Sequence, residues 1–204
     1  MASTTYQRAV IGYHGCDSSL ADDIVAGESI LALSANSYDW LGKGAYFWEH
    51  GPRRAYEWAI AQARNSGRRV SQPAVLGATI NLGVCLDLLD TANTLLLADW
   101  FVKFRHFMKR NGIQLPRNQD APGSRRGDKV LRFRDRAVID FAVRGLAETQ
   151  GTTYQTVRGV FIEGLPAFPG AKIARKSHIQ IAVRDITCLT GFFRAAPEDY
   201  QTGT

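Results

Sequence analysis

Three short segments, far apart in the chain, carry residue types that could do chemistry. They are Tyr13-His14-Gly15, Gly42-Lys43-Gly44-Ala45-Tyr46-Phe47, and the segment 177–183, which has the sequence SHIQIAV. A histidine in such a segment can accept or donate a proton near neutral pH, because the unperturbed pKa of imidazole is about 6.5. The glycine-flanked lysine is not a P-loop, because the four-residue spacer and the terminal Ser or Thr of that motif are missing. Taken singly, each segment also fits an ordinary strand end, a flexible turn or a half-exposed strand.

In this order, the segments resemble the three signature elements of the poly(ADP-ribose) polymerase-like, or diphtheria-toxin-type, ADP-ribosyltransferases. In that family one strand ends in His-Gly, a later Gly-Lys-Gly-aliphatic-Tyr-Phe segment precedes a helix, and a late strand carries a glutamate. Here GKGAYF, followed by PRRAYEWA, is a close match to the middle element. The resemblance covers residues 13–59 and 157–193, and the region between them matches no motif.

The resemblance implies that the chain uses NAD as an ADP-ribose donor and releases nicotinamide. Cleavage of the nicotinamide–ribose bond builds positive charge on the sugar, so catalysis depends mainly on positioning and electrostatics. By the resemblance, His14 would hydrogen-bond a ribose hydroxyl, and the backbone of Gly15 would pair with the nicotinamide amide. Tyr46 would stack on the nicotinamide ring, and Tyr38, or less favourably Trp40, would cover its other face. Further candidate contacts to the dinucleotide are Ser34, Asn36, Gly44 and Lys43, the last of which could equally project into solvent.

The late strand departs from the family pattern, because alignment of its alternating apolar residues places Gln180 where the family has glutamate. Glutamine forms hydrogen bonds but has neither the charge nor the basicity of a carboxylate. We therefore expect transfer of a single ADP-ribose rather than chain elongation. His178 lies two residues earlier, on the same face of a strand, and is a candidate replacement base, although an ordinary strand histidine would look the same. Glu163 is a nearby carboxylate for which loop capping is the preferred interpretation.

Length and composition predict one globular domain spanning residues 1–204, with 45% apolar and 22% charged residues. The three cysteines are odd in number and form no CxxC pair, so neither a metal site nor a disulfide framework is expected. No signal peptide, membrane span or membrane partner is expected either. We therefore expect a cytoplasmic protein, or one delivered into a target cell without a cleaved signal.

The net charge of +6 bears on the kind of partner. It favours an anionic partner, although many domains carry such a balance for solubility alone. Between Lys103 and Arg136 the sequence has eleven basic residues (Lys103, Arg105, Lys109, Arg110, Arg117, Arg125, Arg126, Lys129, Arg132, Arg134 and Arg136) against Asp120, Asp128 and Asp135, with Phe104, Phe107 and Phe133 interleaved. This pattern is typical of a nucleic-acid track, or of core phenylalanines beneath a solvated charged face. The loop between Glu163 and Ser177, with Phe168, Lys172, Arg175 and Lys176, also suits an anionic or aromatic acceptor.

The secondary structure that would position these residues is a mixture of helices and strands. We predict strands over 8–14, 74–82, 157–162 and 179–183, with a turn and a second short element after 82. Helices are predicted over 19–26, 53–65, 95–111 and 138–149, a long loop over 114–129, and a frayed tail from about residue 195. This alternation predicts an α+β fold, and the resemblance implies an ADP-ribosyltransferase-like split antiparallel β-sheet core with flanking helices.

The function predicted from these features is mono-ADP-ribosyl transfer from NAD to a nucleic acid or protein. A bacterial toxin, effector or phage-defence enzyme, with an immunity or antitoxin protein as partner, is the expected setting. The alternatives are an NAD glycohydrolase and an inactive module that binds NAD or nucleic acid. RNA 2′-phosphotransferase activity is disfavoured, because the additional Arg and His pattern of that enzyme type is not found.

Overall fold

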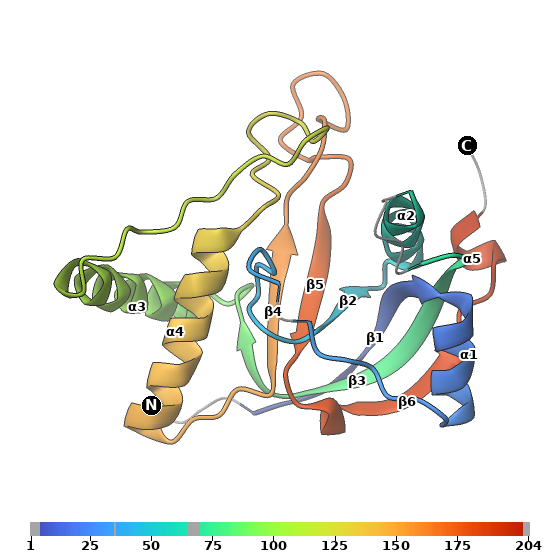
Figure 1. The fold of residues 1–204 in the computed structure, drawn as a ribbon, viewed down its shortest axis with the longest axis horizontal. Helices are drawn as coiled ribbons and strands as arrows, with labels where there is room; N and C mark the ends of the chain where they lie inside the picture. The colour runs from blue at the N-terminus through green and yellow to red at the C-terminus, as the bar shows by residue number, and fades with distance from the viewer. Residues whose placement is uncertain (1–4, 35, 65–69, 202–204) are drawn as a thin grey trace.

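The computed structural model describes residues 5–34, 36–64 and 70–201. Figure 1 shows a central sheet with α3 and α4 on one side and α1, α2 and α5 on the other. The strands are β1 (Thr5–Asp17), β2 (Ala45–Glu49), β3 (Pro73–Asp87), β4 (Thr156–Phe161), β5 (His178–Val183) and β6 (Leu189–Arg194). The helices are α1 (Ser18–Ala26), α2 (Pro52–Ala63), α3 (Thr91–Arg110), α4 (Phe133–Gln150) and α5 (Glu198–Gln201), with a 3-10 turn at Ile186–Cys188. The predicted α+β class is confirmed.

The strands form one six-stranded sheet that closes on itself. Their order is β1-β2-β5-β4-β3-β6, and β3 also pairs with β1. Strands β1, β2, β5, β4 and β3 therefore form a ring, while β6 pairs with β3 outside it. The β3–β4 pairing is parallel and the other pairings are antiparallel, so the sheet is mostly antiparallel.

Strands β1 and β2 separate soon after they meet. Within the described ranges they pair at Gly12↔Glu49 and Tyr13↔Trp48, beyond which β1 continues along β3 and β2 pairs with β5. His14 is the first residue of β1 past this pairing. The sheet thus places His14 at the point where strands β1 and β2 diverge.

Apolar side chains fill both the ring and its flanks. One cluster joins strands of the ring to helix α1 and includes the fully buried Phe47, Leu76, Ile80 and Ile181. A second cluster lies between the sheet and helices α3 and α4, and a third lies beneath α2 and α5. Burial of each large side chain contributes roughly 1.5–3 kcal/mol to stability, so the three clusters hold the helices against the strands.

A buried ion cluster joins three strands of the ring. Arg158 of β4 donates to Glu49 of β2 through Nε at 2.6 Å and Nη2 at 2.8 Å, and to Asp87 of β3 through Nη1 at 2.9 Å. All three residues are less than 9% exposed. The hydrogen bonds to Glu49 are the main cause of the raised pKa of Arg158, which stays charged.

Local signals account for helix α1. The side chain of Asp17 accepts from the backbone N–H of Ser19, and Gly27 ends the helix in the left-handed region at φ 78°. Asp17 also accepts from the backbone of Ser71 and Gln72, which holds its pKa well below its usual range. The predicted helix is confirmed, and its cap ties it to the start of β3.

Other boundaries differ from the sequence-based predictions. β3 continues past residue 82 to Asp87, because Gly83 at φ 56° absorbs the irregularity within the strand. Helix α3 begins four residues earlier than expected, where Asp90 caps it, and α4 begins five residues earlier. Strand β6 was not predicted. Residue 65, the predicted end of the second helix, lies outside the described residues.

The predicted frayed tail is wrong for residues 195–201. Ala195 and Tyr200 are buried, and the Tyr200 ring lies 4.7 Å from that of Tyr56 on α2. Burial of these side chains offsets the entropy cost of ordering the segment. Residues 202–204 lie outside the described part of the chain.

Within residues 5–34, 36–64 and 70–201, no helix is long and apolar enough to cross a membrane. That part of the chain also contains no group of three or more His, Cys, Asp or Glu side chains arranged to hold a metal ion. Cys16, Cys85 and Cys188 are buried free thiols, and burial raises the pKa of each.

Candidate active site

His14 is fixed in one tautomer by the strand beside it. Its Nδ1 lies 2.8 Å from the backbone carbonyl oxygen of Tyr46 on β2. Because a carbonyl oxygen can only accept, Nδ1 carries the proton and Nε2 keeps its lone pair. Burial lowers the pKa of His14, and the hydrogen bond to Tyr46 opposes this only in part. His14 therefore presents a neutral imidazole whose Nε2 can accept a hydrogen bond.

Gly15 lets helix α2 lie directly on β1. A Cβ at this position would collide with the carbonyl oxygen of Ala55 in the first turn of α2. Packing alone therefore requires glycine here, whether or not its backbone also meets a ligand. The contact matters for the site because α2 carries Arg54 and Trp58.

His178, at the start of β5, has the same tautomer as His14. Its Nδ1 lies 2.6 Å from the carbonyl oxygen of Lys176, so Nδ1 donates and Nε2 accepts. Burial, together with the nearby Arg54 guanidinium, lowers the pKa of His178 to about 4. His178 is therefore neutral at pH 7, and its low pKa makes it a weak base.

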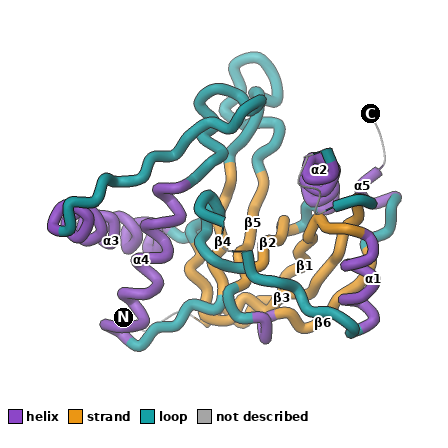
Figure 2. The backbone as a smooth tube through the Cα atoms, viewed as in Figure 1, coloured by secondary structure: helices purple, strands orange, loops and turns teal. Residues whose placement is uncertain are grey.

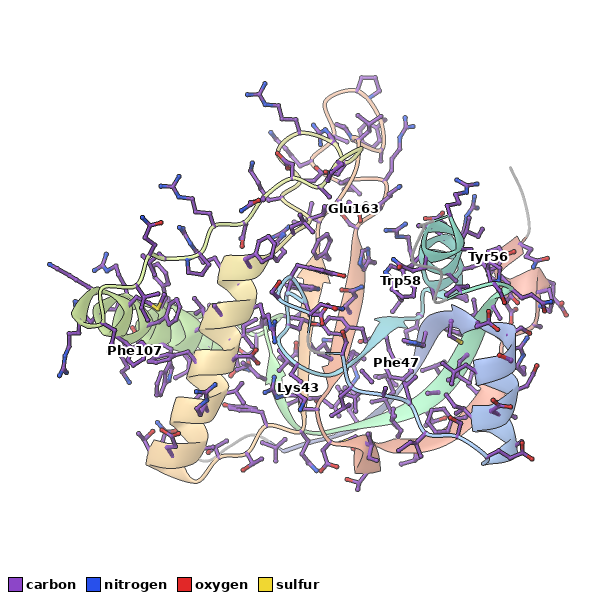
Figure 3. All side chains as sticks on the ribbon, in the orientation of Figure 1. Lys43, Phe47, Tyr56, Trp58, Phe107 and Glu163 are labelled. Carbon is purple, nitrogen blue, oxygen red and sulfur yellow. The ribbon has the colours of Figure 1, made fainter. Side chains whose placement is uncertain are left out.

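Six aromatic rings, including those of both histidines, lie in a series that we call the aromatic row. Successive ring centroids lie 5.3–6.3 Å apart in the order His14, Trp58, Trp48, His178, Phe161 and Trp40. Trp58 is 41% exposed and lies on the side of α2 towards the strands, as Figure 3 shows. The row spans β1, α2, β2, β5, β4 and the loop before β2, so it depends on the pairing of these four strands.

Gln180 supports the end of the aromatic row. Its side-chain oxygen accepts from Nε1 of Trp40 at 2.6 Å, and Gln180 is 8% exposed. Trp40 lies over Gly159, where a Cβ would come within 2.7 Å of the indole. Gln180 pairs with Trp48 of β2 in the sheet. It lies two residues after His178 in β5, so strand alternation places both side chains on the same face.

Tyr46 fixes the turn that precedes β2. Its hydroxyl donates to the carbonyl of Gly42 at 2.8 Å and accepts from the backbone N–H of Leu41 at 2.9 Å. The half-buried ring packs against the cluster beneath α3 and α4, and burial raises the pKa of its hydroxyl. Among the described residues, Tyr46 makes no ring contact with the aromatic row, although its carbonyl holds His14.

The remaining predicted contacts lie around the loop before β2. Asp39 accepts from the Ser34 hydroxyl at 2.6 Å and from the Asn36 backbone at 2.8 Å, while Gly44 pairs with Ser34 through backbone hydrogen bonds. Tyr38 is 45% exposed, and Lys43 is also exposed. Of the predicted residues, the structure thus places His14, His178 and Trp40 in the aromatic row and joins Gln180 to Trp40 by a hydrogen bond. Ser34, Asn36 and Tyr38 are not part of the row.

Three buried donor groups at the aromatic row lack a partner in the described structure: Nε1 of Trp48, Nε of Arg54 and Nε of Arg132. Trp48 is next to His178 in the row. Arg54 lies close enough to His178 to lower its pKa, and the Arg132 guanidinium lies 4.6 Å over the Phe161 ring. Buried donors are nearly always paired in proteins, and each unpaired one costs roughly 1–3 kcal/mol. Acceptor atoms of a ligand or of water would satisfy them.

The carboxylates of Glu57 and Glu163, beside Arg54, are already paired with it. Glu163 accepts from Nη2 of Arg54 at 3.0 Å, Glu57 also pairs with Arg54, and the Glu163 carbonyl accepts from Lys176 at 3.1 Å. Figure 3 shows Glu163 just past the end of β4. Glu163 therefore anchors its loop, which agrees with the preferred interpretation from sequence.

The sequence interpretation did not single out Trp48, Trp58 or Phe161. Trp48 and Trp58 lie within the segment that resembles the family, so their aromatic side chains there could have marked them as site candidates. Phe161 ends a strand outside the recognised motifs, and nothing in its local sequence marked it as a site candidate. No family model, no curated protein and no solved structure matches this chain. Its function is therefore inferred from the arrangement of these residues.

Proposed function

We propose that this chain is an NAD-dependent mono-ADP-ribosyltransferase whose nicotinamide-ribose group binds at the aromatic row. The observation that supports this most is the pair of neutral imidazoles, His14 and His178, within a row of aromatic rings. The oxidised nicotinamide ring is planar and positively charged, so aromatic faces attract it and a protonated imidazole would repel it. Each free Nε2 can accept a hydrogen bond from a ribose hydroxyl.

The unpaired donors add support for a dinucleotide. Nε1 of Trp48 suits a carbonyl or hydroxyl oxygen, and the two arginines suit the negative oxygens of a diphosphate. Each of these atoms is buried, so ligand entry requires a shift of a neighbouring side chain. Trp58 is the exposed neighbour of Trp48 in the row and is the side chain we expect to move.

In the proposed reaction, the bond between ribose C1′ and the nicotinamide nitrogen breaks, and its electron pair leaves with nicotinamide. An acceptor atom forms the new bond to C1′ and loses its proton to solvent or to Nε2 of His178. Gln180 has no basicity, and the low pKa of His178 makes it a weak base. We therefore expect the residues of the site to act mainly by positioning.

One observation favours a second candidate, an NAD-binding module without transfer. The side-chain oxygen of Gln180 is engaged by Trp40, so the residue aligned with the family's glutamate already has a partner. A module of this kind would bind NAD at the aromatic row and release no nicotinamide.

The test is nicotinamide release from labelled NAD, measured with and without added RNA, DNA and cell protein. Wild type is compared with His14→Ala and Trp58→Ala, and with His50→Asn as a control, because His50 is exposed and its φ of 50° suits asparagine. We expect release that requires an acceptor, labels it, and is lost in the first two variants alone. Release without an acceptor would indicate a glycohydrolase, and binding without release would indicate the module.

A further inference from the structure

Helix α3 has a largely exposed face around Phe107, whose ring also lies 5.5 Å from that of Phe141 on α4. Its buried residues, Trp100, Phe104 and Met108, pack towards α4. Phe107 is 47% exposed, and Figure 3 shows it on the side of the molecule far from α2. Lys103 and Arg110 are four residues before and three residues after Phe107, so the three side chains share one face.

This face is hollowed around Phe107. A shallow groove of about 570 Å³ is lined by Lys103, His106, Phe107, Arg110 and Asn111. We call these five residues the Phe107 groove. An exposed aromatic ring between two cations offers a flat surface for a base, with a phosphate contact on either side.

The basic charge of residues 103–136, which include the Phe107 groove, is not neutralised by acidic residues nearby. Its three acidic residues are already paired: Asp120 with Lys129, Asp128 with Arg125 and Asp135 with Arg132. Lys103 and Arg110, which flank Phe107, make no ion pair within the described ranges, and neither do Arg117, Arg126 and Arg134. Arg105 and Lys109 are also without an ion pair there, but they lie on another side of α3 from Phe107. Asp99, one turn before Lys103, marks where the basic face ends. The surplus of cations favours a polyanion over a neutral partner.

A second hollow shares Phe107 with the groove. It measures about 420 Å³, and its lining also includes Phe133 of α4 and Ser37, which lies in the same loop as Trp40 of the aromatic row. Phe133 follows Arg132, whose guanidinium lies 4.6 Å over Phe161 in the aromatic row. Above it, the loop 111–132 meets the loop 162–177, as Figure 2 shows, and Arg125 donates to the Gly164 carbonyl at 2.8 Å. A strand bound at Phe107 can therefore follow one surface to the site.

We propose that the Phe107 groove binds single-stranded nucleic acid and directs it to the aromatic row as the acceptor of ADP-ribose. A base stacks on Phe107, and flanking phosphates contact Lys103 and Arg110. A single strand is specified because stacking requires an unpaired base, and an acidic protein would not use the ring. The acceptor role rests on the proposed function, whereas binding to the groove does not.

The experiment measures binding of the intact protein to fluorescent RNA and DNA single strands of about 12 nucleotides, without NAD. We expect Phe107→Ala to weaken binding about tenfold, while Phe107→Trp retains it. Arg110→Ala should reduce the slope of log affinity against log salt by about 0.7, the share of one phosphate contact on a single strand. Arg105→Ala is the matched control, since Arg105 is an exposed arginine on another side of the same helix, and it should bind as wild type does. Thermal melts confirm that each variant is folded.

Four results would overturn the proposal. Three of them are wild-type binding that polyglutamate displaces as readily as unlabelled RNA, full binding by folded Phe107→Ala, and equal losses in Arg105→Ala and Arg110→Ala. Preference for duplex over single strands would also overturn it. Nicotinamide release assays separate this inference from the proposed function. Release without strand binding refutes the groove alone, and strand binding without release supports the groove while refuting transfer.

Discussion

At the scale of single residues, protonation decides what the candidate site can bind. His14 and His178 each donate through Nδ1 to a backbone carbonyl, and burial lowers the pKa of both. Each therefore offers an uncharged acceptor at neutral pH. This distinguishes the site from a phosphate-binding site built on protonated histidines, and it explains why a cationic ring is a suitable ligand.

The titration of His178 predicts how stability depends on pH. Its pKa of about 4 lies below the ordinary value of 6.5, so between these values the unfolded chain binds a proton that the folded chain excludes. Stability therefore falls as pH is lowered through this window. We expect His178→Gln to make the free energy of unfolding, measured with urea, less dependent on pH between 6.5 and 4. An unchanged pH dependence would show that His178 titrates alike in both states.

The Tyr46 hydroxyl predicts a loss of stability that ring stacking would not. Tyr46→Phe keeps the ring but leaves the Leu41 N–H and the Gly42 carbonyl without their partner. We expect the free energy of unfolding in urea to fall by about 1–3 kcal/mol. Tyr38→Phe, at an exposed position, should change it by less than about 0.5 kcal/mol. Equal effects of the two substitutions would mean that the hydroxyl does not fix the turn.

At the scale of elements, the seating of α2 on β1 decides whether the aromatic row forms. Helix α2 supplies Trp58 and Arg54 and approaches β1 most closely at Gly15. Gly15→Ala should push the helix away, which costs roughly 1–3 kcal/mol and weakens NAD binding. Gly191→Ala is the control, because its Cβ would meet nothing within 4 Å on β6. Thermal melts and NAD titration test both variants, and full NAD affinity in Gly15→Ala would separate α2 from the site.

Elements with local signals could be predicted from sequence, and those defined by distant pairing could not. Helix α1 lies between the capping residue Asp17 and the left-handed Gly27, so its bounds are readable in the chain itself. Strand β6 exists because it pairs with β3, more than one hundred residues earlier, at positions such as Leu76↔Arg194. Its own sequence, LTGFFR, has no clean alternation that would have predicted it.

The same distinction applies to the candidate site. His14, His178 and Gln180 were found because each lies in a short segment whose residue types suggest chemistry. Trp48 and Phe161 lie on either side of His178 because β2, β5 and β4 are neighbours in the sheet. Such proximity follows from strand order, which no local pattern specifies.

At the scale of the whole molecule, the site depends on closure of the strand ring. Strands β2 and β4 contribute Trp48 and Phe161 to the aromatic row, and the buried cluster of Arg158, Glu49 and Asp87 joins β4, β2 and β3 inside the ring. The ion pairs span strands that are distant in sequence. Any change that opens this cluster should therefore disturb both stability and the spacing of the row.

Arg158→Met tests this dependence. It leaves two buried carboxylates uncompensated, so we expect a loss of about 3–5 kcal/mol in urea unfolding, together with weaker NAD binding. Lys129→Met, which breaks the exposed pair with Asp120, should cost less than about 1 kcal/mol. Combining Arg158→Met with Glu49→Leu and Asp87→Leu removes the stranded charges and should recover most of the stability. If Arg158→Met costs no more than Lys129→Met, apolar packing alone closes the ring. If the triple variant regains stability but not NAD affinity, the ion cluster also sets the geometry of the aromatic row.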